Sequence, residues 1–185
     1  MVAAPARWIV LVFRMPSEPA RHRIALWREL RKAGAVLLGQ SSWALPDVPA
    51  VHPLLDRAAA LVTAGGGEFL RLAAAGLTPA DAAHLTAVYE SARADEWREL
   101  LADSDKYLAE LVHEHAQQKY TLAELEEEEQ SLDRLRRWYR DLRSRDLLGT
   151  SLTPRADERL KECSASLEEY ADAVYARLGA PPPIG

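Results

Sequence analysis

Cysteine is almost missing from this sequence, which has a single one, Cys163, in 185 residues. One thiol excludes an intrachain disulfide and suits a reducing compartment, so we expect a cytoplasmic protein. Cys163 is separated from Leu160, Leu167, Tyr170 and Val174 by helical spacings, which place all five residues on one apolar helix face. This pattern favours a core thiol over redox or metal chemistry.

Long apolar runs are missing as well, because no stretch approaches the roughly 20 residues that a membrane-spanning helix requires. The run from Trp8 to Phe13 is short, ends at Arg14 and lacks a cleavage-like site. It therefore predicts a core strand rather than a signal peptide. We expect no contact with a membrane.

Catalytic signatures are equally scarce, with no G-x-S-x-G, no phosphate-binding glycine loop and no paired cysteine motif. Glu110 and His113 have the E-x-x-H spacing of di-metal sites in helical bundles, but such a centre needs two of these motifs. His113 and His115 are two apart on a helix and cannot both face one ion. We expect neither an enzyme nor a cofactor, and a metal-dependent enzyme is the weakest alternative.

Charge is unevenly placed along the chain, although the net charge is only −5. Residues 1–72 hold nine Lys or Arg against five Asp or Glu, whereas the remainder holds fourteen against twenty-three. This division indicates a basic N-terminal part that attracts an anionic partner and an acidic C-terminal part. A mixed, solvated surface is the alternative.

The N-terminal part predicts an α+β fold. After the strand at 8–13, Ser17 is placed to cap a helix that Gly34 ends. The expected apolar face of this helix consists of Ala20, Ile24, Trp27 and Leu30. A hairpin over 35–46, a helix over about 50–64 and a strand over 68–72 complete the order of a ferredoxin-like βαββαβ unit.

The rest of the chain predicts an antiparallel bundle of three helices. The inward-facing seam expected on the second helix consists of Leu125, Leu132, Leu135, Tyr139 and Leu142. Their start signals are Thr78 with Asp81, Thr121 with Glu124, and Thr153 with Pro154. The first helix, about 79–118, is long enough that we expect a break or bend near Asp95 or Asp103. We therefore divide the chain into a ferredoxin-like domain over 1–77, a three-helix extension over 78–180 and a tail over 181–185.

Two groups of basic residues are candidate sites for DNA or an oxyanion. The first group comprises Arg14 at the end of the first strand and a stripe on the following helix, opposite Ile24 and Trp27: Arg21, Arg28, Arg31 and Lys32. The second lies on the helix that begins at 122: Arg136, Arg137, Arg140 and Arg143. A purely solvated stripe is the alternative for the first group. Helix-dipole stabilisation and pairing such as Asp133 with Arg137 are the alternative for the second.

Three pieces of the sequence resemble the N-terminal domain of ChrB, the chromate-resistance protein. The first comprises WIVLVFRMPSEPAR, HRIALWRELRKAGAV and SSWALPD. The second is KYTLAELEEEEQSLDRLRRWYRDLRSRDLLG at 119–149, and the third is ECSASLEEYADAVY at 162–175. Longer ChrB proteins carry a second, C-terminal domain, which we do not expect in this sequence.

The resemblance implies a non-enzymatic transcriptional regulator that binds promoter DNA and loosens its hold when chromate is present. DNA, chromate or another oxyanion, and a second copy of the chain are the candidate partners. The alternative is a protein-interaction or oligomerisation module, in which the arginines are structural.

Overall fold

The computed structural model describes residues 7–40 and 42–179. They form two compact units, of which the first extends to Arg93 and also includes Ser144–Thr150. The second consists of Ala94–Arg143 and the chain from Ser151 onward. The chain first passes from one unit to the other after Arg93, inside the helix Pro79–Gln117. The boundary predicted after residue 77 falls in the loop before that helix.

The first unit contains a four-stranded antiparallel sheet. Its elements follow in the order β1 (Trp8–Arg14), α1 (Ala20–Lys32), β2 (Val36–Gly39), β3 (Ser42–Pro46), α2 (His52–Ala64) and β4 (Glu68–Ala74), with a 3₁₀ turn at Pro49–Val51 before α2. The strands are arranged β2-β3-β1-β4, so that β1 pairs with both β3 and β4. The α+β class predicted from the sequence is confirmed.

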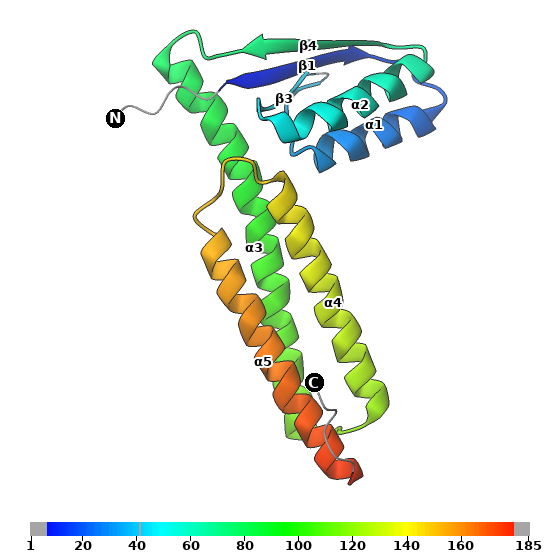
Figure 1. The fold of residues 1–185 in the computed structure, drawn as a ribbon, viewed down its shortest axis with the longest axis vertical. Helices are drawn as coiled ribbons and strands as arrows, with labels where there is room; N and C mark the ends of the chain where they lie inside the picture. Colours follow the sequence, from blue (N-terminus) through cyan, green and yellow to red (C-terminus); the bar gives the residue numbers. More distant parts are fainter. Residues whose placement is uncertain (1–6, 41, 180–185) are drawn as a thin grey trace. The chain divides into compact units, whose positions relative to one another are not determined.

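Both faces of this sheet carry apolar side chains. On one face, α1 and α2 lie together (Figure 1), and their Leu26, Leu30 and Val62 are fully buried with Leu11 and Leu45 of the sheet. The other face contributes a second cluster: Trp8, Val36 and Ala44, with Tyr89 packed on them. Fully burying one such side chain stabilises the fold by about 1.5–3 kcal/mol, so these clusters determine the position of α1.

The apolar face that the sequence predicts for α1 is right for Leu30 and wrong for Ile24 and Trp27. Ile24 and Trp27 are about half exposed, whereas Leu26 and Leu30 are fully buried. The core side of α1 is therefore rotated away from Ile24 and Trp27. The predicted Ser17 cap is also wrong, because the cap residue is Pro19 and makes no side-chain hydrogen bond.

The helix α3 (Pro79–Gln117) begins with the predicted capping box. The Asp81 carboxylate accepts hydrogen bonds from the Thr78 hydroxyl and N–H, and the Asp81 N–H donates back to the Thr78 hydroxyl. These bonds lower the pKa of Asp81. A break near Asp95 or Asp103 is excluded, since α3 continues through both residues.

The second unit is built from the rest of α3, most of α4 (Leu122–Arg145), and α5 (Thr153–Leu178). Its core contains the residues predicted to face inward from α4 and α5: Leu125, Leu132, Leu135, Leu142, Cys163, Tyr170 and Val174. Trp97 and Leu111 of α3 join them. Thr121 caps α4, because its hydroxyl accepts the Glu124 N–H at 3.2 Å.

The cap predicted at the start of α5 is wrong. Thr153 already lies inside the helix, and the residue before it, Leu152, makes no side-chain hydrogen bond. The Thr153 hydroxyl is buried without a hydrogen-bond partner in the described part of the chain.

Among the described helices, none combines the length and the apolar character that crossing a bilayer requires.

Candidate functional site

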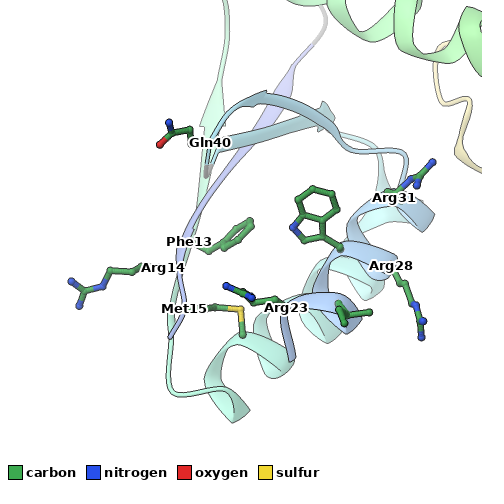
Figure 2. Close-up of a pocket in the computed structure, with 9 residues that line it drawn as sticks. Phe13, Arg14, Met15, Arg23, Arg28, Arg31 and Gln40 are labelled. Atoms are coloured by element: carbon green, nitrogen blue, oxygen red, sulfur yellow. The ribbon is translucent and has the colours of Figure 1, made fainter. Parts of the chain in front are cut away.

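The main candidate site is a hollow of about 880 Å³ in the first unit. It lies between the end of β1, the outer side of α1 and the β2–β3 turn (Figure 2). Its lining combines arginines with apolar side chains: Phe13, Arg14, Met15, Arg23, Ile24, Trp27, Arg28, Arg31 and Gln40. We call this hollow the arginine pocket.

The helical repeat explains why α1 contributes most of the lining. Arg23, Trp27 and Arg31 are spaced four residues apart, and Ile24 and Arg28 form a second row beside them. The first row flanks the buried side of α1, which Leu26 and Leu30 define, and the second row lies farther from it. The same helix therefore attaches to the sheet on one side and borders the arginine pocket on the other.

Aromatic side chains give the arginine pocket an apolar wall. Trp27, 50% exposed, packs edge-on against the buried Trp43, with ring centroids 5.5 Å apart. Phe13 stacks on Phe69 at 6.2 Å, and Figure 2 shows its ring directed into the hollow. An exposed indole beside guanidinium groups provides a surface for a flat group next to an anion.

The charge around the arginine pocket is available to a ligand. The side chains of Arg23, Arg28 and Arg31 make no ion pair or hydrogen bond with any residue that the structure describes. Arg14 lies 3.7 Å from Glu68. In Figure 2 Arg23 extends toward Met15, whereas Arg14, Arg28 and Arg31 extend outward from the rim of the hollow. Guanidinium groups bind phosphate and other oxyanions through paired N–H donors, which these arginines have free.

The first predicted group of basic residues is only partly brought together. Arg14, Arg28 and Arg31 line the arginine pocket, whereas Arg21 and Lys32 do not. The prediction that Arg28 lies opposite Ile24 and Trp27 is wrong, because all three border the same hollow. Sequence reasoning missed Arg23, although its spacing of four residues from Trp27 was visible in the sequence.

The second predicted group forms a surface of the second unit. Arg136 donates to the Ser164 hydroxyl at 3.0 Å and lies 3.7 Å from Asp133. Asp133 thus pairs with Arg136 rather than with the predicted Arg137. Arg137, Arg140 and Arg143 are exposed, and none of the four arginines lines the arginine pocket.

The candidate metal and thiol residues have other contacts. His113 hydrogen-bonds Gln117 at 2.7 Å, and His115 contacts the Tyr120 hydroxyl at 3.0 Å. Within residues 7–40 and 42–179, no three His, Cys, Asp or Glu side chains are arranged to hold a metal ion. Cys163 is fully buried, and burial raises the pKa of its thiol to about 11, which disfavours the reactive thiolate.

Comparison with known families gives a match over most of the chain. The sequence model of the family described as "Protein ChrB, N-terminal" matches residues 23–181. The matched range begins at Arg23 and so includes all the α1 residues of the arginine pocket. No curated protein and no solved structure gives a significant match.

Proposed function

The chain belongs to the ChrB N-terminal family, and from this we propose that it is a chromate-responsive transcriptional regulator. In this proposal it acts in the cytoplasm without enzymatic activity, binds promoter DNA and releases it when chromate is present. The observation that carries the proposal is the arginine pocket, where three arginines of one helix have no partner among the described residues.

The chemistry of the two ligands explains how one site responds to both. The phosphates of DNA and chromate are tetrahedral oxyanions, and both accept paired hydrogen bonds from guanidinium groups. Arg23, Arg28 and Arg31 then contact the DNA backbone in the absence of chromate. Chromate competes for the same donors and thereby weakens the hold on DNA.

The finer description of the fold is also a proposal. The succession of elements in the first unit and the strand order β2-β3-β1-β4 support a ferredoxin-like assignment. The shared core of α3, α4 and α5 supports a three-helix bundle in the second unit.

A protein-interaction module is the second candidate function, and one observation favours it. Leu70 and Leu72 are 59% and 48% exposed on β4, which is an edge strand of the sheet. An exposed apolar edge strand is a template for pairing with another chain, including a second copy. In this case Leu70→Glu changes the sedimentation coefficient of the protein and leaves any DNA binding intact.

The regulator proposal is tested by gel shift with the DNA upstream of the protein's own operon. We expect a shifted complex at low salt that chromate dissociates, while sodium chloride at equal ionic strength leaves most of the complex intact. Chloride controls for screening, because it lacks the paired acceptor oxygens with which chromate binds a guanidinium group. Equal effects of the two anions contradict a chromate response, and the absence of any complex at low salt contradicts DNA binding.

A further inference from the structure

A second hollow, of about 750 Å³, lies in the second unit and is lined by α3, α4 and the loop that joins them. Its wall is strongly acidic and includes six carboxylic acids: Asp103, Glu110, Glu114, Glu124, Glu127 and Glu128. We call it the acidic pocket.

The protein's own cations neutralise only part of this charge. Lys106 pairs with Asp103 at 2.6 Å, and Lys119 pairs with Glu114 at 2.8 Å. Arg134, the third cation of the wall, donates to the Ser131 hydroxyl. The other four acids, Glu110, Glu124, Glu127 and Glu128, make no side-chain ion pair with a described residue.

Two of the acids, Glu114 and Glu128, are buried although each has few or no partners for its carboxylate. Glu128 is only 6% exposed, borders the acidic pocket, and has no side-chain partner in the part of the chain that the structure describes. Glu114 is 2% exposed; Lys119 contacts its Oε1 atom, and its Oε2 atom is buried without a hydrogen-bond partner among the described residues. The nearby Tyr170 hydroxyl interacts with Glu114 but donates its hydrogen bond to the Lys119 carbonyl. Leaving a carboxylate oxygen buried and unpaired costs free energy, which a bound cation recovers.

The spacing of the acids indicates what kind of cation fits. No three of them are arranged to hold a metal ion. Instead, Glu110 and Glu114 are one turn apart on α3, and Glu124 and Glu128 are one turn apart on α4, about 6 Å along each axis. Two ammonium groups joined by a short alkyl chain span a comparable distance.

The remaining wall suits the alkyl part of such a cation. Tyr107, Leu135 and Trp138 supply apolar surface, and an indole face also attracts ammonium groups. We propose that the acidic pocket binds a linear polyamine, whose ammonium groups pair with acids one turn apart on a helix, Glu110 with Glu114 or Glu124 with Glu128. Its methylene groups lie along this apolar surface.

Protonation links this binding to pH. Burial, together with the nearby charges of Glu110 and Glu114, raises the pKa of Glu128 to about 7. The other titratable groups of the wall are Asp103, Lys106, Tyr107, Lys119, Glu124, Glu127 and Arg134, and Tyr170 of α5 also interacts with Glu128. A polyamine favours the charged carboxylate, so binding releases a proton near neutral pH and weakens below it.

The test is isothermal titration of the full chain with spermidine at pH 8 and pH 6. We expect saturable binding at pH 8 and at least tenfold weaker binding at pH 6. Glu128→Gln should weaken binding at pH 8 by at least tenfold. The matched control is Glu126→Gln, which removes the same charge from an exposed position of α4 outside the acidic pocket.

Several outcomes overturn the proposal. The first is the absence of saturable heat with spermidine at pH 8. The second is an equal loss of spermidine affinity in Glu128→Gln and Glu126→Gln. The third is a loss of spermidine binding in magnesium chloride that is as large as the loss in sodium chloride of the same ionic strength. The last two results mean screening by surface charge. Glu114→Gln is a second probe of the pocket, and unfolding midpoints equal to or above that of the wild type establish that each variant is folded.

Discussion

The indole of Trp27 lies edge-on against that of Trp43, with an interplanar angle of 76°. Trp43 is 5% exposed and belongs to the core, whereas Trp27 is half exposed and lines the arginine pocket. One aromatic pair therefore connects the candidate site to the core that supports it.

Replacing the two tryptophans should have different consequences. Trp27→Ala should lower the free energy of unfolding by about 1–2 kcal/mol, because it removes one aromatic contact and a side chain that is only half buried. Trp43→Ala should cost about 3–5 kcal/mol, as for a large core side chain. Urea unfolding measures both, and equal losses would show that Trp27 is buried.

The Tyr89 hydroxyl joins two backbone groups that are distant in sequence. It donates to the Arg145 carbonyl at 2.8 Å and accepts the Leu147 N–H at 3.0 Å. Tyr89→Phe should cost about 1–3 kcal/mol, since it removes two hydrogen bonds made by a buried hydroxyl. Tyr175→Phe is the control, because the Tyr175 hydroxyl has no partner among the described residues, and its unfolding midpoint should not change.

The two threonines near helix starts should respond in opposite ways. Thr121→Val removes a hydroxyl that caps α4 and should lower stability by about 0.5–2 kcal/mol. Thr153→Val removes a buried hydroxyl without a partner and should be neutral or stabilising. Thermal unfolding compares them, and destabilisation by Thr153→Val would reveal a hydrogen bond to that hydroxyl.

Glu128 should make stability depend on pH. Between about pH 4.5 and 7 the folded protein retains a proton on Glu128 that the unfolded chain has released. The folded state therefore binds more protons, and the contribution of Glu128 to stability falls as pH rises through this window. Glu128→Gln should raise the free energy of unfolding by about 1–3 kcal/mol at pH 8 and leave it unchanged at pH 4.

The measurement is urea unfolding at both pH values without polyamine. Glu126→Gln, at an exposed position of the same helix, should show no such difference. An effect of Glu128→Gln that is equal at pH 4 and pH 8 would mean that the Glu128 carboxyl does not titrate in this window.

Sequence pattern was sufficient where one physical signal dominated. The run Trp8 to Phe13 forms the central strand β1, and Gly34, with φ of 77°, follows the end of α1. A Cβ at Gly34 would lie 2.4 Å from the Arg145 carbonyl oxygen, so glycine is required there for space as well as conformation. In α4, leucines spaced three and four apart correctly predicted the buried side.

Pattern failed where apolar residues serve the surface. Ile24 and Trp27 have the spacing of a core face, and only the positions of Leu26 and Leu30 in the fold show which side is buried. Because the buried side was assigned wrongly, Arg28 was predicted to lie opposite Ile24 and Trp27, and Arg23 was not predicted as a site residue. The acidic pocket was missed for a different reason, because its acids come from two helices whose register the sequence does not give.

The central claim is that the arginine pocket binds the DNA backbone, and the salt dependence of binding tests it most directly. Arg28→Glu and Arg31→Glu should each flatten the slope of log affinity against log salt by about 0.9 or more. Arg21→Glu makes the same charge change on the same helix outside the pocket, and should alter the slope much less. Equal changes in all three variants, or none in any of them, would contradict the account.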